Sequence, residues 1–343
     1  MKVCFARVDR IGDLVLTLPC QRAWLSVNPH DSIEWLLSEN VRFVAENVCP
    51  PINANYVKSP SAFSDKMAQA FELSKFLRAR GFDHIVAIHV PWWVALAAFL
   101  AGTKKRTGVA SQWFSWIFFN HRLRQKRSLA EKNEAHYNLD LINFALGRGV
   151  NNLPFFAGKM DANKTTVMKW AQKLKNQNVD LNKLVVIHPG MGGSARNWAA
   201  KNYFQLADGL VLSGASVVIT GSATDRNFID ETNILQIKGV FLAKTETGED
   251  LLGVLSLAKA LVAPSTGVAH LGAALGVPVI GIYSPVRVQS PRRWSPLGDR
   301  VQVLVPIVPC PGIFDCLGAK CPHYDCMTQI TVDSVMSCVM DKL

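Results

Sequence analysis

Runs of apolar and β-branched residues recur along the first half of the chain, and stretches with helical spacing separate them. The expected strands are residues 2–8, 33–37, 54–57 and 84–89. Apolar positions with helical spacing fill 14–27 and 64–80, and a further helix is expected over 131–146, before Gly147. This alternation of strands with helices predicts a parallel, doubly wound sheet.

The alternation restarts after a loop-like stretch at 151–162 and a polar helix at 163–178. Expected strands follow at 183–188, 216–220, near Val240, and at 261–263, 278–283 and 301–305; expected helices begin near residues 201, 224 and 250. The sequence therefore predicts two α/β domains with parallel sheets, at 1–155 and 181–330. A linker helix over 156–180 joins them, and a helix at 331–343 closes the chain.

Length and composition suit this organisation. A chain of 343 residues with 49% hydrophobic residues can bury a core in each of two domains. The longest apolar run, 91–101, is shorter than the roughly 18 residues of a membrane span. Lys2 leads directly into VCFARV, so we expect no signal peptide and a soluble or peripheral protein.

The net charge of +11 is unevenly placed. Residues 101–127 contain no acidic residue and seven basic ones: Lys104, Lys105, Arg106, Arg122, Arg124, Lys126 and Arg127. Such a block suits nucleic acid, anionic lipid or a phosphorylated substrate, and equally an ordinary solvated surface. We take these seven residues as candidates for binding the acceptor or the membrane.

Aromatic residues interleave with this basic block. They are Trp92, Trp93, Trp113, Phe114, Trp116, Phe118 and Phe119. Aromatic rings beside cations are typical of an element in a membrane interface; the alternative is a core helix flanked by surface charge.

Two loops of the second domain are suited to phosphate. Ser265, Thr266 and Gly267 lie between an expected strand and an apolar helix, so backbone N–H groups at the helix start can hold an anion. His270, one turn further, is either a ligand of that anion or a satisfied core histidine.

The second loop, PGMGGSARNW, follows the strand at 183–188. Its Gly193, Ser194 and Arg196 can surround a diphosphate, although glycines there can also be purely structural. Asp225, which follows Gly221 and Ser222, is either a charge at a helix N-terminus or a ligand of ribose.

Asp13 is the candidate group of the first domain. It follows the first strand in the turn DRIGD, which has one glycine and so lacks the GxGxxG pattern of a dinucleotide site. An acidic residue is favoured at a helix start by capping alone, and a carboxylate there can also act as a general base.

A carboxylate in one domain and a diphosphate cradle in the other suit group transfer from a nucleotide-activated donor. The cradle stabilises the departing diphosphate, and Asp13 takes the proton of the acceptor hydroxyl. No pair of acidic residues follows a strand to hold a divalent ion, and Arg196 with helix N-termini can carry the charge, so no metal is expected.

The residues resemble the glycosyltransferase family 9 heptosyltransferases of lipopolysaccharide core assembly. The resemblance rests on RVDRIGDLVLTLP from Arg7, HPGMGGSARNW from His188, STGVAHLGAALGVPVIGIYSP from Ser265, the helix with Glu134-Ala135-His136-Tyr137, and a tail in which Cys326-Met327 precedes Ile330. It implies a GT-B fold, with the two domains facing a central cleft, and inverting, metal-independent transfer from ADP-heptose to a lipopolysaccharide core or lipid A saccharide. It also implies work at the inner face of the cytoplasmic membrane, with peripheral contact to anionic lipid.

The resemblance implies roles residue by residue. Asp13 falls on the general base, and Ser194, Thr266, Gly267 and His270 fall on or beside nucleotide-binding positions. Arg196 stands where well-known members have a lysine against the donor phosphates, so the charge is kept but not the geometry. Ser265 stands where many heptosyltransferases have an aspartate, so a different nucleotide sugar remains an alternative.

The late cysteines leave a further alternative. Cys310, Cys316, Cys321 and Cys326 lack paired CxxC spacing, which favours a structural role over zinc without deciding between them. Zinc at these cysteines, together with the basic block, would fit a nucleic-acid-binding protein, which is one alternative to a glycosyltransferase. A second alternative is a GT-B-like epimerase, a sugar-nucleotide enzyme of another reaction type.

Overall fold

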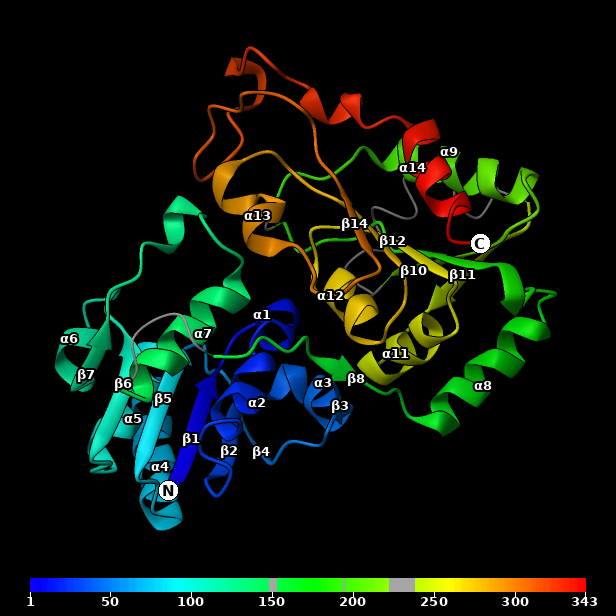
Figure 1. The fold of residues 1–343 in the computed structure, drawn as a ribbon. Coiled ribbons are helices and arrows are strands. Elements are labelled where there is room, and N and C mark those ends of the chain that lie inside the picture. Colours follow the sequence, from blue (N-terminus) through cyan, green and yellow to red (C-terminus); the bar gives the residue numbers. More distant parts are fainter. Residues whose placement is uncertain (148–152, 194, 222–237) are drawn as a thin grey trace. The chain divides into compact units, whose positions relative to one another are not determined.

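The computed structural model describes residues 1–147, 153–193, 195–221 and 238–343. It divides into two compact units, which Figure 1 colours along the chain. Unit 1 comprises Met1–Arg127 and Glu134–Gly158, and unit 2 comprises Ser128–Asn133 and Lys159–Leu343. The helix predicted as a linker thus belongs to unit 2, where it is α8, Lys164–Lys175.

Unit 1 is built on a parallel sheet with strand order β4-β2-β1-β5-β6-β7. Its strands are β1 Lys2–Arg7, β2 Ser32–Ser38, β4 Ala54–Val57, β5 His84–His89, β6 Lys105–Val109 and β7 His121–Leu123. A short strand, β3 Val48–Cys49, lies between β2 and β4 in the sequence. The strands expected from apolar runs are present, whereas β6 and β7, within the basic block, were not predicted.

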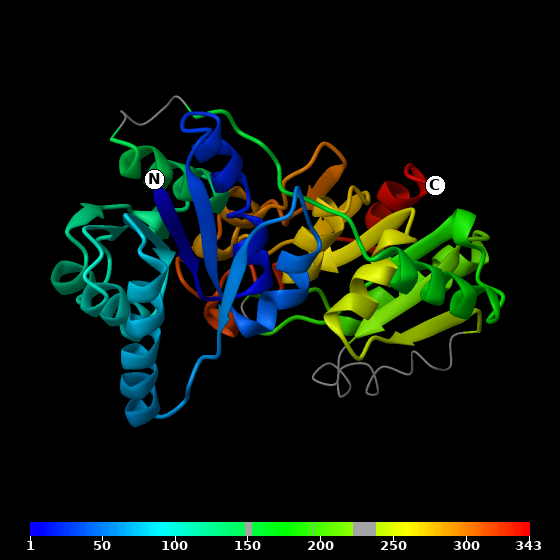
Figure 2. The same cartoon turned by 90° about the horizontal axis from the view of Figure 1, so that it is seen from below.

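Helices cover both faces of this sheet. They are α1 Ile11–Val15, α2 Pro19–Leu25, α3 Arg42–Glu46, α4 Phe63–Arg80, α5 Trp92–Leu100, α6 Ser115–Phe118 and α7 Glu134–Ala145. Cys4 and Ala6 of β1 belong to the core cluster that contains the inner residues of α4 and α5. The alternate residue Phe5 packs edge-on against Trp24 of α2, with ring centroids 5.5 Å apart. Figure 2 shows α4 in light blue as the long helix of this unit.

The helix predicted over 14–27 is in fact two. α1 ends at Val15 and α2 begins at Pro19, which occupies its first turn. Proline has no N–H group and its ring clashes with the carbonyl four residues earlier, so it starts a helix well but cannot continue one.

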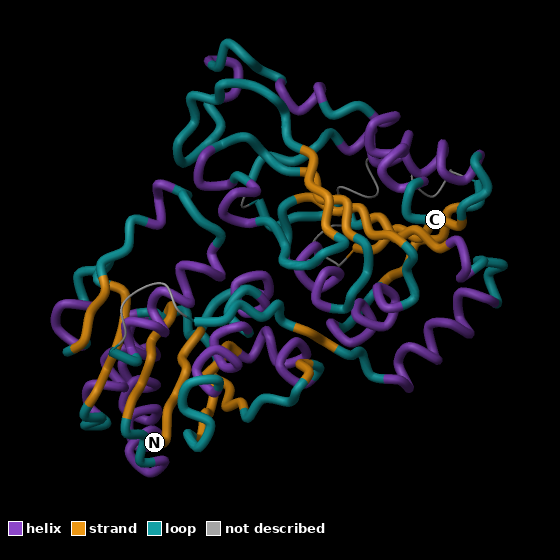
Figure 3. The backbone as a smooth tube through the Cα atoms, in the orientation of Figure 1, coloured by secondary structure: helices purple, strands orange, loops and turns teal. Residues whose placement is uncertain are grey.

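Unit 2 repeats the plan, with a parallel sheet of order β11-β10-β9-β12-β13-β14. Its strands are β9 Leu184–Ile187, β10 Ser216–Gly221, β11 Val240–Lys244, β12 Ala260–Pro264, β13 Val279–Ile282 and β14 Val301–Leu304, and a short strand β8, Lys159–Met160, precedes them. The tube in Figure 3 shows this alternation of strands and helices.

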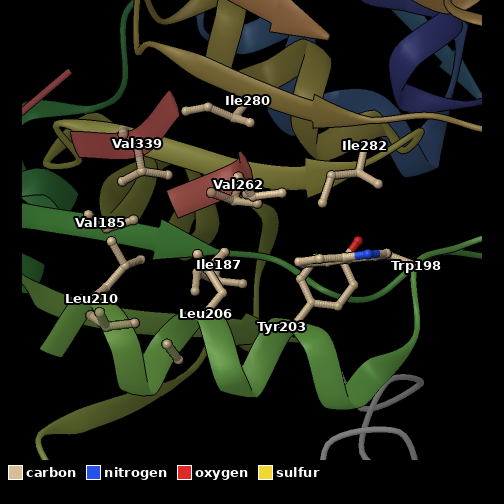
Figure 4. Close-up of a cluster of buried hydrophobic side chains, with 14 of the residues drawn as sticks. Val185, Ile187, Trp198, Tyr203, Leu206, Leu210, Val262, Ile280, Ile282 and Val339 are labelled. Carbon is tan, nitrogen blue, oxygen red and sulfur yellow. The ribbon is translucent and has the colours of Figure 1, made fainter. Parts of the chain in front are cut away.

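The helices of unit 2 also lie on both faces of their sheet. Besides α8 they are α9 Ala200–Leu212, α11 Gly248–Ser256, α12 Gly267–Ala274, α13 Pro291–Trp294 and α14 Val332–Met340. In Figure 4, Leu210 of α9 lies beside Val185 of β9, and Leu206 lies beside Ile187. Val339 of α14 belongs to the same buried cluster. On the opposite face, Gly272 of α12 lies against Leu261 of β12.

Both units are thus Rossmann-like, with parallel sheets and helices on both faces, and the predicted fold class is confirmed. Within the described ranges, no helix combines the length and the apolar character needed to cross a membrane. The helix expected near residue 224 lies outside the described residues.

Candidate active site

The candidate loops follow the strands at which each sheet changes its winding direction. In unit 1 the chain crosses from β1 to β2 on one side and reaches β5 on the other, and the loop with Asp13 follows β1. In unit 2, β9 and β12 are the equivalent neighbours; the loop with Arg196 follows β9, and Ser265 follows β12. Doubly wound sheets bind their ligands at the carboxyl ends of these strands.

Arg7 organises the site in unit 1. Its side chain is 1% exposed at the end of β1, and its Nη2 donates to Asp13 Oδ1 at 2.6 Å. The same guanidinium binds Asp9, with Nε 2.9 Å from Oδ1 and Nη2 2.9 Å from Oδ2. One buried cation therefore orients two carboxylates that follow β1 in the chain, Asp9 in the loop and Asp13 in α1.

Helix α7 completes this network. Arg7 Nη1 donates to Asn138 Oδ1 at 3.3 Å and lies 3.9 Å from Glu134 Oε1. Arg127 also binds Glu134 and donates to Asn138 Oδ1 at 3.2 Å. Arg127, predicted as part of an acceptor or membrane surface, is thus directed into the network around Asp13.

Asp9 differs from Asp13 in its electrostatics. Burial raises the pKa of the Asp9 carboxyl to about 7; the positive charge of Arg7 opposes this rise, and the negative charge of Asp13 adds to it. The pair thus places a carboxyl that exchanges its proton near neutral pH beside the predicted base.

Arg7 and Asp9 were not predicted from the sequence as site residues. A local signal existed, because Arg7, Asp9 and Asp13 follow one another at spacings of two and four directly after a buried strand. The contribution of Asn138 could not be foreseen, because it lies 131 residues from Arg7 in the chain.

In unit 2 the loop after β9 is held firmly at its far end. Asn197 Nδ2 donates to Pro189 O at 2.9 Å, and Trp198 Nε1 donates to Ile330 O at 2.8 Å. Trp198 and Tyr203 lie together at the end of the core in Figure 4. The anchored loop brings Gly193, at φ 71°, to an exposed position where a larger residue would be strained.

Arg196 emerges from this loop and is held on several sides. Its Nη2 lies 2.8 Å from Asp325 Oδ2, and its guanidinium lies over the Tyr324 ring, 4.7 Å from the centroid. Its backbone N–H donates to Gln289 Oε1 at 3.2 Å. Ser194, two residues earlier, lies outside the described residues, as does Asp225.

The loop after β12 leads directly into α12. Thr266 is the N-cap residue, with extended φ and ψ, and its side chain makes no capping hydrogen bond. Ser265 lies against the hydroxyl of Tyr283, which donates to Trp294 O at 2.8 Å. The first N–H groups of α12 lie where the sequence predicted an anion-binding helix end, and that role stays a prediction.

His270 lies in α12 and is 4% exposed. Burial lowers its pKa to about 4, so the imidazole is neutral at physiological pH. Its Nδ1 has no hydrogen-bond partner in the described part of the chain. A buried polar atom without a protein partner is costly, which favours the ligand interpretation of His270 over the core one.

The four late cysteines are free thiols that line one pocket within unit 2. Arg196, His323 and Tyr324 also line it. Burial raises the pKa of the Cys326 thiol, and the neighbouring Cys310 and Asp325 act in the same direction. Within the described ranges, no three His, Cys, Asp or Glu residues are placed to hold one metal ion.

A family model and similar sequences agree on one family. The family model described as glycosyltransferase family 9 (heptosyltransferase) matches residues 70–314, which include Arg196 and the loop at Ser265. A Haemophilus influenzae protein named "Putative glycosyltransferase" is 30% identical over 307 residues, covering 87% of this chain and 86% of that protein. Lipopolysaccharide heptosyltransferase 3 of Escherichia coli is 26% identical over 292 residues, covering 83% of this chain and 84% of that protein.

Solved structures share the fold. The Escherichia coli ADP-heptose LPS heptosyltransferase II superposes with a TM-score of 0.78 at 19% identity, covering 99% of this chain and 98% of that one. A family 9 glycosyltransferase from Veillonella parvula also gives a TM-score of 0.78, at 17% identity, covering 89% of this chain and 85% of that one. These likenesses confirm the predicted GT-B fold. The family model and the similar sequences confirm the resemblance seen in the sequence. The chain therefore belongs to glycosyltransferase family 9, the heptosyltransferase family.

Proposed function

We propose that this glycosyltransferase moves a heptose from ADP-heptose to a saccharide of the lipopolysaccharide core or lipid A, with inversion and without a metal ion. The observation that carries the proposal is Asp13, held by a buried arginine at the carboxyl end of β1, in a chain of the heptosyltransferase family. The relative from Escherichia coli is named a lipopolysaccharide heptosyltransferase, which supports the same substrate class.

In the proposed step, Asp13 accepts the proton of the acceptor hydroxyl. The hydroxyl oxygen forms a bond to the anomeric carbon of the donor sugar, and the bond from that carbon to the diphosphate breaks. The electron pair of the broken bond leaves with the nucleoside diphosphate. Arg7 positions the Asp13 carboxylate through its 2.6 Å hydrogen bond, so the base meets the acceptor in a fixed orientation.

The residues proposed for the donor lie in unit 2. Arg196 and the N-terminus of α12, with Thr266 and Gly267, balance the charge of the departing diphosphate. The unpartnered His270 Nδ1 is available for a hydrogen bond to the bound nucleotide sugar. Gly193 and Ser194 belong to the same proposed cradle, and Asp225 is proposed for the ribose.

The identity of the donor depends on Ser265. A serine cannot supply the negative charge of an aspartate to sugar or ribose hydroxyls, which leaves a non-heptose nucleotide sugar as the alternative donor. The hydroxyl of Tyr283 beside Ser265 supports a neutral, hydrogen-bonding surface at this point. We also propose that the enzyme works at the inner face of the cytoplasmic membrane, in peripheral contact with anionic lipid, since its proposed acceptor is lipid-anchored.

Replacing the base tests the mechanism. Asp13→Asn keeps the size of the side chain but cannot accept the proton, so we expect kcat to fall by about 100- to 10,000-fold. Calorimetric affinity for the donor is expected to stay within about twofold, because the donor residues lie in the other unit. Asp65→Asn, at the exposed start of α4, is the matched control and should transfer normally.

Two results would count against the proposal. Near-normal turnover by Asp13→Asn would remove Asp13 from the chemistry. Loss of transfer in the presence of a chelator, restored by a divalent cation, would show that the reaction needs a metal.

A further inference from the structure

The aromatic residues of the basic block divide into buried and exposed groups. Trp93 of α5 is buried, as are Phe114 and Phe119, so part of the block is ordinary core. Trp113, Trp116 and Ile117 are 66%, 59% and 58% exposed. Large apolar side chains at this exposure, so close together in the chain, are unusual on a protein surface that faces only water.

A helical turn places the three exposed residues on one side. The N–H of Trp116 donates to Trp113 O at 3.3 Å, and the N–H of Ile117 donates to Phe114 O at 3.1 Å. Positions 113, 116 and 117 are therefore neighbours on one face of the turn. We call these three residues the apolar tip.

The tip rests on a rigid base. The Phe119 ring lies so close to the β6 backbone that a Cβ at Gly108 would approach its Cδ2 and Cε2 to 2.3 Å. Phe114 belongs to the core cluster of α4 and α5. The exposed aromatic side chains are thus presented by an ordered segment of unit 1.

Cations lie directly beside the tip. After residue 120 the chain runs along the edge strand β7, and Arg122, Arg124 and Lys126 are exposed while the alternate residues turn inward. The Arg122 guanidinium lies over the Trp116 ring, 4.8 Å from its centroid, and donates to Trp116 O at 2.8 Å. The row of cations and the tip are therefore parts of one surface.

Lys104 extends this surface. Its side chain is exposed, and its carbonyl accepts a hydrogen bond from Asn120 Nδ2 at 2.7 Å, which places it next to the end of the turn. The other basic residues of the block have internal roles. Lys105 donates to Ala145 O, Arg106 donates to Phe118 O and Thr103 O, and Arg127 binds Glu134.

We propose that the apolar tip of Trp113, Trp116 and Ile117, with the cations Lys104, Arg122, Arg124 and Lys126, docks unit 1 onto the surface of an anionic lipid bilayer. Indole rings at headgroup depth, with cations at the lipid phosphates, satisfy both halves of this surface. The absence of any acidic residue from 101 to 127 means that no charge within the segment opposes the contact. The inference specifies the proposed membrane contact but does not depend on Asp13 or on the donor.

A nucleic acid fits this surface less well. It would pair with the cations, but an aliphatic residue such as Ile117 at the centre of the exposed face offers nothing for a base to stack on. A bilayer accepts both the aromatic and the aliphatic side chains, and single-stranded RNA is therefore the competitor in the test.

The test compares four variants of the full chain by sedimentation with vesicles. Lys104→Gln/Arg124→Gln/Lys126→Gln removes three cations and retains Arg122, which holds the loop. Trp113→Ser/Trp116→Ser removes the aromatic part of the tip. The matched controls are Lys58→Gln/Lys66→Gln/Lys75→Gln and Phe63→Ser/Phe71→Ser, on the same unit but outside the proposed surface.

Wild type is expected to bind vesicles that contain phosphatidylglycerol and to bind phosphatidylcholine vesicles only weakly. Each Lys or Arg near an anionic surface strengthens partitioning by about fivefold, so the Lys104/Arg124/Lys126 variant, which lacks three cations, should partition onto the anionic vesicles roughly 100-fold less than wild type. The loss should be clearest at low salt. The tip variant should lose at least about tenfold, and both controls should stay within about twofold of wild type.

Folding and catalysis are measured alongside. Unchanged melting temperatures, and unchanged transfer to a deacylated, water-soluble acceptor, would separate lost docking from lost structure or chemistry. Equal losses in the control variants would overturn the proposal, as would vesicle binding unaffected by either test variant. Tryptophan-dependent binding to single-stranded RNA without binding to vesicles would also overturn it.

Discussion

Arg7 shows how one residue can define a site that its local sequence does not reveal. Its place in β1 alternates with Cys4 and Ala6, so its side chain leaves the sheet on the face covered by α2 and α7. A buried guanidinium there needs several acceptors, and Asp9, Asp13 and Asn138 supply them. The position of Asp13 is therefore fixed by a residue six positions earlier and by a helix far along the chain.

Asp9 gives this network a pH dependence. Its native pKa of about 7 is above the unfolded value of about 3.9. Between these values the native state holds a proton that the unfolded chain has released, so the contribution of Asp9 to the free energy of unfolding falls as the pH rises from about 4 to about 7 and then levels off. The buried, neutral His270 contributes in the opposite direction over part of this range, so the effect of Asp9 is measured as a difference in slope between variant and wild type. Asp9→Asn should remove that slope, which is at most about 1.4 kcal/mol per pH unit.

Urea titrations between about pH 4.5 and pH 7.5 measure this effect. The exposed Asp65→Asn is the control and should retain the wild-type slope. If Asp9→Asn also retained it, Asp9 would titrate in the native state as it does in the unfolded chain, and its raised pKa would be wrong.

At the scale of elements, the apolar patterns located most of the strands and helices, and the misses have physical causes. Central strands such as β9 and β12 are buried on both faces, so their sequences are almost continuously apolar. The strands β6 and β7 contain Lys105, Arg106 and Arg122, because β7 is at the edge and its neighbour is only partly covered. Their pairing comes from the sheet beside them and not from their own pattern.

The packing of α12 on its sheet makes a prediction at this scale. A methyl group at Gly272 would lie 2.5 Å from Leu261 Cδ2, and Leu261 is fully buried and cannot move aside. Gly272→Ala should therefore lose about 1–3 kcal/mol in the free energy of unfolding, although alanine favours helices by about 1 kcal/mol. It should also weaken nucleotide binding, because α12 carries the loop from Ser265 to Gly267.

Gly209 of α9 provides the matched control. Among the described residues, a methyl group there would meet only the Met336 side chain, with the sulfur at 3.2 Å and Cε at 3.9 Å, and a methionine side chain adapts easily. Gly209→Ala should be as stable as wild type or up to about 1 kcal/mol more stable. A Gly272→Ala protein with a melting temperature at or above that of wild type would show that α12 is not held this closely.

At the scale of the whole molecule, the sequence predicted two units of the same kind but did not predict which distant residues assemble each site. Each unit has its own sheet, its own core and its own candidate loops at the carboxyl ends of neighbouring strands. The motif positions of Asp13, Arg196 and Ser265 could be read along the chain. The partners Asp325 and Tyr324, 129 and 128 positions from Arg196, could be found only once unit 2 was folded.

This separation allows donor binding and proton removal to be tested independently in the full chain. A ligand bound at 100 times its dissociation constant stabilises the native state by about 2.7 kcal/mol, which is a shift of roughly 5–10 °C for a unit of this size. Among ADP, GDP, UDP and CMP, we expect ADP to give the largest shift. Arg196→Ala should lose most of that shift, and Asp13→Asn should retain it, because its change lies in unit 1.

A larger shift with another nucleotide would assign a different donor class and point to Ser265 as its cause. A full shift in Arg196→Ala would instead leave Arg196 as a structural partner of Asp325 and remove it from the diphosphate cradle.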